Sequence, residues 1–500
     1  MSTSEDATVT RLLVNLVDIE DRGLHFEGSF TSWRDHIAES RRLASVLRAR
    51  LDPSKPPHIG VILENTPGFA RLLTAAALAG LVLVGLNSTR RGSALRRDIE
   101  LADCQFVVAD ESDTVAGLQH PQIEIADVRP DDLYMLIFTS GTSGDPKAVQ
   151  ITHAKVASAG IMLSSRFGLG STDVCYLSMP MFHSNAVMAG WSVAVAAGAS
   201  IALRRKFSAS GFLDDVREYG ATYANYVGKP MSYVLATPQR PDDAENPLRI
   251  MYGNEAAAGD TDRFATRFGA VVVDGFGSTE GGVALGWAPG TPPGAIGPLT
   301  PDIQILDIQT GRPCPPAIFD QSGKVINAAE ATGELVNVTG PGRFTGYYKN
   351  PEADAERMVG GRYHSGDLAY ADENGYVYFA GRLGDWLRVD GENLGTAPIE
   401  RVLLRHPDIT EVAVYGVPDP TVGDRVMAAL VGADFDPVTL SEFLSAQEDL
   451  GPKQWPSFIR VSGELPRTAT FKVIKRQLSA EALETADPVW ALTNGTYTRT

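Results

Sequence analysis

The chain has 500 residues, of which 44% are hydrophobic and 21% charged, an ordinary globular composition whose length favours two to four domains. A net charge of -17 argues against nucleic acid as the main partner, because phosphate-binding surfaces normally leave a basic footprint. Cys104, Cys175 and Cys314 are too few and too scattered for a disulfide framework or a cysteine-based metal site, which indicates a reducing compartment.

The chain begins without the marks of a secretory signal, because acidic Glu5 and Asp6 stand where such a signal would be basic. The longest apolar run, Leu72 to Leu86, is shorter than the roughly 20 residues that span a bilayer. It indicates a buried helix followed by a strand. We therefore expect a cytoplasmic protein without a transmembrane segment, and peripheral membrane contact stays open if the substrate is a lipid.

The first predicted helix begins at Ser32, which forms a capping-box pattern with Asp35 and precedes apolar residues from Trp33 to Leu47 at helical spacing. Residues 59–63 then indicate a strand. Further strand-like runs alternate with helical patterns and lie at residues 106–109, 134–138, 174–178, 222–226, 249–252 and 271–274. This alternation predicts an α/β fold with parallel sheets covered by helices.

A stretch dense in proline and glycine, residues 289–302, interrupts that alternation. The runs IQILDI and ELVNVT that follow it indicate antiparallel strands of a smaller, barrel-like subdomain. After about residue 385, a helix and three strands predict a small α+β domain, with the helix at 398–404 and the strands at 411–415, 426–431 and 458–461. We expect an N-terminal domain over residues 1–382 and a C-terminal domain over residues 383–500.

A run of hydroxyl groups and glycines directly follows the apolar strand YMLIF. It comprises Thr139, Ser140, Gly141, Thr142, Ser143 and Gly144 and ends at Lys147. Its glycines allow the backbone to approach an anion, consecutive N–H groups can bind phosphate oxygens, and the lysine adds a positive charge. The pattern predicts a nucleotide phosphate loop, with a flexible surface loop as the alternative. It differs from the P-loop of NTPases, in which Gly-Lys-Ser/Thr are adjacent.

This run resembles the phosphate-binding signature of the superfamily that contains acyl-CoA synthetases, peptide-synthetase adenylation domains and luciferases. Five more signatures of that superfamily follow in its order: MPMFHSN at 179–185, GFGSTEGG at 275–282, YHSGDL at 363–368, GRLGDWLRVDGEN at 381–393 and LPRTATFKVIKR at 465–476. The resemblance covers essentially the whole chain. It implies ATP and CoA as cosubstrates, Mg²⁺ as cofactor, and a small C-terminal domain that is mobile.

The resemblance assigns Glu280 to Mg²⁺ and to catalysis, and Thr279 to the α-phosphate. It implies that further nucleotide contacts come from Phe276, Gly277, Ser278, Asp367 and Arg382, in addition to the phosphate loop. Phe276 would stack on adenine, and Asp367 would accept the ribose hydroxyl groups. From the residues alone, a turn between glycines stays open for Glu280 and a solvated turn for Asp367.

His183 is implied at the acyl site, together with Gly253 and Asn254. A packed core histidine remains the alternative for His183, because apolar residues surround it in the sequence. Amino-acid-activating relatives carry an aspartate after this histidine, and here none follows. An amino acid is therefore disfavoured as substrate.

Lys472 is implied as the lysine that stabilises charge when a carboxylate attacks the α-phosphate. Gly384 is implied as the hinge of the mobile domain, because glycine suits a position that absorbs a large change in backbone angle, and Gly391 would line the pantetheine tunnel. A solvated surface lysine and a plain turn are the alternatives. Ala148 and Phe471 depart from the glycines usual after the loop lysine and before the catalytic lysine.

The runs TATFK at 468–472, GNEAAAGDTDRFATRFG at 253–269 and GDWLRVDGEN at 384–393 look most like the very-long-chain acyl-CoA synthetase branch. That resemblance favours a bulky apolar acid, either a long-chain fatty acid or a steroid side-chain acid. The expected enzyme is an AMP-forming acid–thiol ligase that makes an acyl-CoA thioester through acyl-AMP. Two rivals stay open: a fatty-acyl-AMP ligase that delivers to a carrier protein, and a non-catalytic lipid- or nucleotide-binding relative. A homodimer also stays open.

Overall fold

The computed structural model describes most of the chain, with short gaps. The described residues are 6–88, 90–115, 119–139, 146–256, 259–321, 323, 325–383, 387–389, 392–419, 423–432, 436–447, 450–451, 454–468, 472–493 and 495–500. Internal contacts divide the chain into two compact units, Met1–Gly281 with Arg343–Ala355 and Gly282–Gly342 with Glu356–Thr500. Among the described residues, no helix is long and apolar enough to cross a membrane.

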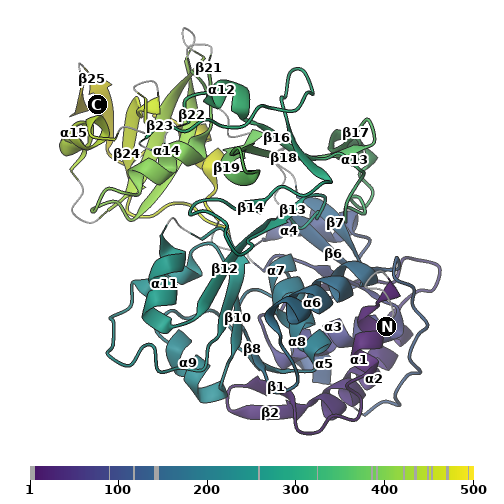
Figure 1. The fold of residues 1–500 in the computed structure, drawn as a ribbon. Helices are drawn as coiled ribbons and strands as arrows, with labels where there is room; N and C mark the ends of the chain where they lie inside the picture. Colours follow the sequence, from purple (N-terminus) through teal and green to yellow (C-terminus); the bar gives the residue numbers. More distant parts are fainter. Residues whose placement is uncertain are drawn as a thin grey trace. The chain divides into compact units, whose positions relative to one another are not determined.

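The first unit contains two sheets built mainly from parallel strands (Figure 1). One has the order β5-β3-β4-β6-β7, and its strands are β3 (His58–Val61), β4 (Val82–Gly85), β5 (Phe106–Val108), β6 (Leu133–Thr139) and β7 (Lys147–Thr152). Within this unit, the other sheet has the order β12-β11-β10-β8-β9-β1-β2. Its strands are β1 (Gly23–Phe26), β2 (Ser29–Ser32), β8 (Val174–Leu177), β9 (Ser200–Leu203), β10 (Tyr223–Val227), β11 (Ile250–Asn254) and β12 (Val271–Gly277). Parallel strands in this arrangement require helical connections that cover the sheet faces.

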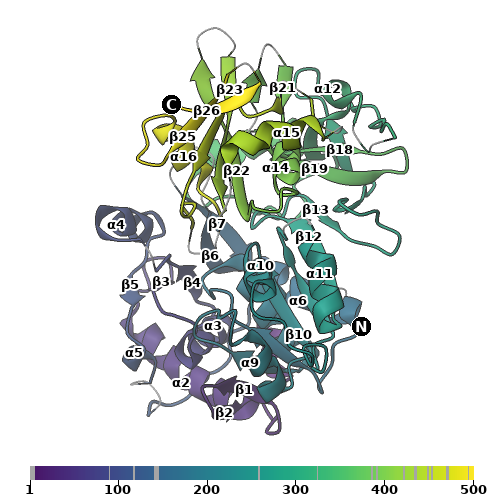
Figure 2. The same ribbon diagram turned by 90° about the vertical axis from the view of Figure 1, so that its left-hand side faces the viewer.

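Helices of the first unit supply these connections, and some of them begin at a side-chain cap. The helices are α1 (Val9–Val14), α2 (Trp33–Arg50), α3 (Pro67–Ala79), α4 (Gly92–Leu101), α5 (Ser112–Val115), α6 (His153–Phe167), α7 (Ser184–Ala186), the π-helix η2 (Val187–Trp191), α8 (Ser192–Ala197), α9 (Phe212–Tyr219), α10 (Pro230–Leu235) and α11 (Asp260–Phe268). The Ser32 hydroxyl accepts from Asp35 N at the start of α2, as the capping-box pattern predicts. Helices α6 and α8 lie side by side (Figure 1), and α11 packs beside β12 (Figure 2).

The second unit begins with a half-barrel of antiparallel strands. Its sheet has the order β14-β19-β18-β16-β15 with β17 beside β18, and the strands are β14 (Gly297–Pro298), β15 (Ile303–Leu306), β16 (Gly333–Asn337), β17 (Met358–Val359), β18 (Arg362–Ala371) and β19 (Tyr376–Arg382). The short strand β13 (Ala284–Gly286) and helix α12 (Ala328–Ala331) also belong to this unit, whereas most of α13 (Pro351–Arg357) belongs to the first unit. The predicted change to antiparallel strands after the Pro/Gly-dense stretch is confirmed.

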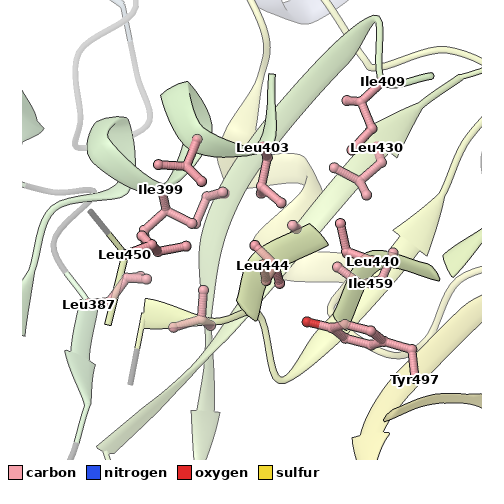
Figure 3. Close-up of a cluster of buried hydrophobic side chains, with 14 of the residues drawn as sticks. Leu387, Ile399, Leu403, Ile409, Leu430, Leu440, Leu444, Leu450, Ile459 and Tyr497 are labelled. Atoms are coloured by element: carbon pink, nitrogen blue, oxygen red, sulfur yellow. The ribbon is translucent and has the colours of Figure 1, made fainter. Parts of the chain in front are cut away.

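The rest of the second unit is an α+β layer with its own core. Its strands are β20 (Leu387–Val389), β21 (Glu392–Leu394), β22 (Glu411–Asp419), β23 (Gly423–Val431), β24 (Phe458–Val461), β25 (Val489–Thr493) and β26 (Thr496–Arg499). Its helices are α14 (Thr396–Leu403), the 3₁₀-helix η4 (Pro437–Thr439), α15 (Leu440–Ser445) and α16 (Lys475–Glu481). Figure 3 shows buried side chains from α14, α15 and this sheet, including Leu403, Leu444 and Ile459, packed into one cluster.

The predicted fold class is confirmed, with two corrections to the strand directions. Strand β7 was missed, and it pairs antiparallel with β6, while β1 pairs antiparallel with β2. The sheets are therefore mixed rather than wholly parallel, because short hairpins extend them. The predicted boundary at residues 382 and 383 falls inside the second unit and stays a prediction about moving parts.

Candidate active site

The predicted phosphate loop connects the two strands of a hairpin. Thr139 ends β6 and Lys147 begins β7, and the two residues face each other in the ladder. The Tyr347 segment lies on the other side of β7, where Val149 and Tyr347 form an antiparallel bridge. Ser140, Gly141, Thr142, Ser143 and Gly144 lie outside the described residues. The strand ends nevertheless bring the loop's first hydroxyl group and its lysine to one place.

Glu280 lies at this place and is 9% exposed. Its Oε1 atom accepts hydrogen bonds from the Tyr347 hydroxyl over 3.0 Å and from the Thr139 hydroxyl over 3.3 Å. The Lys147 ammonium group lies 5.4 Å from the centre of the Tyr347 ring, within the range of a cation–π contact. Two segments distant in sequence thus donate to one carboxylate, and Lys147 lies beside the tyrosine of one of them.

The turn that carries Glu280 is held through its main chain. The ammonium group of Lys155, on α6, donates to the Glu280 carbonyl oxygen over 2.7 Å, and Arg343 N donates to the Gly281 carbonyl over 3.0 Å. Gly281 has φ +73°, and a Cβ atom there would lie 3.2 Å from the Lys155 side chain. Burial lowers the pKa of Lys155 to about 8, although Glu280 opposes this shift. A buried lysine at this point therefore holds the main chain of the turn from which Glu280 extends.

His183 and Thr279 are connected through one hydroxyl group. His183 occupies the N-cap position of α7, and the next residue, Ser184, shares a hydrogen bond of 2.8 Å with Thr279. Asn185 accepts from Asn225 Nδ2 over 2.6 Å. The chain then forms the π-helix η2, an irregularity frequent at functional sites. The histidine segment and the Thr279–Glu280 turn therefore belong to one site.

The ends of β11 and β12 supply the other predicted first-unit residues. Gly253 has no room for a side chain, because a Cβ atom would lie 2.2 Å from the Tyr226 carbonyl oxygen. Asn254 Nδ2 donates to the Gly275 carbonyl over 2.8 Å and so connects the two strand ends. Phe276 is half-buried, whereas Gly277 and Ser278 are exposed. These residues lie at the ends of β11 and β12, and Thr279 follows soon after β12 in the sequence.

Asp274 is a partly buried acid at the same edge of the sheet. Its Oδ1 atom accepts from the Tyr226 hydroxyl over 2.6 Å and from Ala256 N over 3.3 Å. Burial raises the pKa of Asp274 from 3.8 to about 6, although these two hydrogen bonds oppose the shift. The strand end therefore carries a carboxyl group that titrates close to neutral pH.

In the second unit, Asp367 and Arg382 face each other across β18 and β19, and Arg382 Nε lies 3.4 Å from Asp367 Oδ1. Asp367 lies within β18, next to a part of the strand that Glu334 holds. The two carboxylate oxygens of Glu334 accept from Gly366 N over 2.8 Å and contact His364 Nδ1 over 2.7 Å. Gly366 has φ +73°, which favours glycine. The predicted ribose-binding carboxylate therefore extends from a strand segment that Glu334 fixes.

Lys472 lies in the same unit, is half-buried, and follows the gap at residues 469–471. Gly384 and Gly391, predicted for the hinge and the pantetheine tunnel, lie outside the described residues. Their roles stay predictions.

The oxygen atoms around Glu280 fit a magnesium ion. Mg²⁺ is usually bound by one or two carboxylates together with substrate phosphates, rather than by a cage of protein ligands. Glu280 has the hydroxyl groups of Thr139 and Tyr347 as neighbours. Within the described part of the chain, no group of three or more histidine, cysteine, aspartate or glutamate residues could hold a metal ion. These groups agree with a site in which Glu280 is the only protein carboxylate bound to Mg²⁺ and the nucleotide's phosphates bind the same ion.

Sequence reasoning missed several residues of the site: Tyr347, Lys155, Ser184 and Arg343 in the first unit and Glu334 in the second. Weak signals existed for three of them. Ser184 lies in the signature MPMFHSN, Arg343 lies in the glycine-rich stretch 340–346, and Tyr347 follows that stretch directly. Lys155 and Glu334 are recognisable only from their contacts.

Two family descriptions match the chain. Residues 15–348 match the family described as AMP-binding enzyme, and residues 398–472 match the AMP-binding enzyme C-terminal domain.

Individual relatives match over nearly the whole length. A medium/long-chain fatty-acid–CoA ligase, FadD17 of Mycobacterium marinum, is 60% identical, with 98% of this chain and 99% of that protein covered. A steroid-22-oyl-CoA synthetase of Rhodococcus jostii is 42% identical, with 97% and 93% covered. Among solved structures, ATP-bound MatB from Rhodopseudomonas palustris has a TM-score of 0.83 at 25% identity and covers 95% of this chain and 98% of its own.

Proposed function

The chain belongs to the AMP-binding enzyme family, and on that premise we propose that it activates a hydrophobic carboxylic acid with ATP and transfers the acyl group to CoA. The observation that carries this proposal is that the Thr139 and Tyr347 hydroxyl groups both donate to Glu280 beside the predicted phosphate loop, with Lys147 against the Tyr347 ring. That arrangement offers hydroxyl groups, a cation and a carboxylate to a nucleotide's phosphates.

The reaction has two steps. The carboxylate of the acid attacks the α-phosphorus of ATP, so that a bond to the acyl oxygen forms, the bond to the bridging oxygen breaks, and pyrophosphate leaves. The CoA thiol then loses its proton and attacks the acyl carbon, which releases AMP. Mg²⁺, when bound, would neutralise charge on the phosphates, and Glu280 would hold it.

The charge and the sequence position of each residue indicate its role. Lys147 and Thr279 would bind phosphate oxygens, while Asp367 with Arg382 would hold the ribose. Lys472 would stabilise the charge that develops when two anions meet in the first step. Support for these assignments comes from the family signatures, from the fixed turn that carries Glu280 and from the strand segment, held by Glu334, that carries Asp367.

The substrate is proposed to be a long-chain fatty acid or a steroid side-chain acid. This is supported by the two relatives, one named for medium or long-chain fatty acids and the other for a steroid-22-oyl group. The helical segment after His183 agrees with an apolar acid, because Ala186, Val187 and Trp191 carry no charge. We place the reaction in the cytoplasm, since all three cysteines are free thiols.

The proposal is tested by measuring CoA-thioester formation with a panel of fatty, aryl, steroid side-chain and amino acids, together with acetate. Turnover should be highest for a medium, long-chain or steroid acid, and each buried CH₂ should add roughly 0.8 kcal/mol of binding. Acetate or a free amino acid turned over equally well would contradict it. Acyl-AMP that accumulates without thioester would favour a carrier-protein thiol as acceptor, and no acid-dependent AMP at all would favour a non-catalytic binding protein.

A further inference from the structure

The segment that carries Lys472 is a short hairpin whose limbs are described up to residues 468 and 472. Arg467 and Val473 form an antiparallel bridge across it. Thr468 N donates to the Lys472 carbonyl over 2.8 Å, and Lys472 N donates to the Thr468 hydroxyl over 3.2 Å. The main chain of Lys472 is therefore fixed to the opposite limb.

The second limb of this hairpin ends at Lys475, the first residue of α16, and Lys475 is attached to another helix. Its ammonium group lies 2.8 Å from Glu400 Oε1 and donates to the Thr396 hydroxyl over 2.9 Å. Both partners belong to α14. The same Glu400 oxygen accepts from Val414 N, on β22, over 2.7 Å. Lys475 and Glu400 thus connect the start of α16 to both α14 and β22.

The first limb is attached to the same strand. Arg467 is ion-paired with Glu411, which begins β22, and both side chains are largely buried. Val473 packs against the core cluster that contains Leu465 and Leu478. The hairpin is therefore held by an ion pair on each side of Lys472, and both pairs lead to β22.

We propose that Lys475, held by Glu400, is a positioning residue for Lys472 in the adenylation half-reaction. This inference rests on the proposed function, in which the Lys472 ammonium group bridges two anions. A displacement of about 1 Å at such a group can cost roughly 100-fold in rate. Lys475 is three residues from Lys472, so the pair with Glu400 fixes the backbone from which Lys472 extends. Lys475 acts through that backbone and is assigned no contact with substrate.

A purely stabilising ion pair makes different predictions. The side chains of Lys475 and Glu400 are 22% and 20% exposed, and partly exposed pairs contribute little to stability. A stabilising role would change the melting temperature and would affect both half-reactions alike. A positioning role lowers the rate of adenylation and leaves thioester formation from supplied acyl-adenylate unchanged, because Lys472 has no assigned role in that step.

The experiment compares Lys475→Met, Lys475→Arg, Glu400→Gln and the Lys475→Met/Glu400→Gln double variant in the full-length enzyme. Acid-dependent pyrophosphate exchange reports adenylation, and thioester formation from supplied acyl-adenylate reports the second step. Lys475→Met should lower the kcat of exchange by roughly 10- to 100-fold with the KM for ATP unchanged, and Lys475→Arg should keep most of the rate. The double variant should be no slower than the slower single variant, because both changes remove the same pair.

A matched control is Lys206→Met, which removes another lysine–glutamate pair, 2.6 Å from Nζ to Glu64 Oε1, in the first unit. Its exchange rate should equal that of the parent. If Lys475→Met does not fold, Glu400→Gln keeps the side-chain volume and gives the same measurement. Unchanged exchange in a folded variant, or an equal loss in both half-reactions, would overturn the inference. A parent enzyme that forms no acid-dependent AMP would instead contradict the proposed function.

Discussion

The Tyr347 hydroxyl donates a hydrogen bond to Oε1 of Glu280 over 3.0 Å, and the ring of the same tyrosine faces the Lys147 ammonium group. One buried side chain therefore connects the proposed metal-binding carboxylate with the lysine of the phosphate loop. Tyr347 is 2% exposed, and its main-chain N–H donates to Asp354 over 2.7 Å, so it has little freedom to move.

Replacing Tyr347 with phenylalanine should weaken the use of magnesium-bound ATP. The change keeps the ring under Lys147 but removes a hydrogen bond to a charged group, worth about 1.5 to 3 kcal/mol. We expect the KM for ATP and the magnesium concentration needed for half-maximal exchange to rise by roughly tenfold, a shift that corresponds to about 1.4 kcal/mol. Binding of ATP with magnesium, measured by calorimetry, should weaken to the same degree.

Tyr348→Phe is the matched control for this prediction. Its hydroxyl donates to Asp103 over 2.7 Å, away from Glu280, and its removal also deprives a carboxylate of one donor. Nucleotide binding by Tyr348→Phe should equal that of the parent. If Tyr347→Phe also bound magnesium-ATP as tightly as the parent, the Tyr347 hydroxyl would have no part in holding Glu280.

Lys472→Ala should lower acyl-adenylate formation by at least the roughly 10²- to 10³-fold seen when one group that stabilises a transition state is removed. Thioester formation from supplied acyl-adenylate should suffer much less. Both rates are measured in the same folded variant by pyrophosphate exchange and by thioester release. An equal fall in the two half-reactions would show that the role assigned to Lys472 is wrong.

Gly384→Pro tests the two orientations of the C-terminal domain that the family resemblance implies. Proline fixes φ near roughly -65°, so a residue that must adopt different values in the two half-reactions would be held in one of them. Acid-dependent pyrophosphate exchange should persist, while CoA-thioester production and thioester formation from supplied adenylate should both collapse. A folded variant that makes thioester at the parental rate would place the pivot elsewhere, for instance at Asp385.

Asp274→Asn should stabilise the protein relative to the parent as the pH rises. Burial raises the pKa of Asp274 from 3.8 to about 6, so the native state binds its proton more tightly than the unfolded chain. The stability that this proton contributes is complete below pH 3.8 and is lost as the pH rises through 6. Asparagine keeps an oxygen that can accept from the Tyr226 hydroxyl and has no proton to lose.

Urea denaturation at several pH values measures this effect. Between pH 5 and pH 8, the stability of Asp274→Asn relative to the parent should increase by about 1 to 1.5 kcal/mol. A difference that is constant with pH would mean that Asp274 titrates in the folded protein as it does in the unfolded chain.

The sequence by itself determined the main parallel strands of the first unit, several strands of the second, and the identity of the motifs, while β1, β2, β7 and β9 were missed. Strands such as β6, β8 and β12 follow from runs of apolar residues, and the start of α2 follows from Ser32 and Asp35, because these signals act between near neighbours in the chain. The phosphate loop, the Glu280 motif and the Lys472 motif were recognisable for the same reason, since each is a short contiguous pattern.

Only the tertiary structure decided which side chains hold those motifs in place. Lys155 and Glu280 are 125 residues apart, Tyr347 and Glu280 are 67 apart, and Lys475 and Thr396 are 79 apart. A lysine in a helix or a tyrosine in a loop has the same local pattern whether it faces solvent or a buried carboxylate. The partner becomes defined only when folding brings distant segments together and removes water from between them, because burial gives such a hydrogen bond its positioning effect.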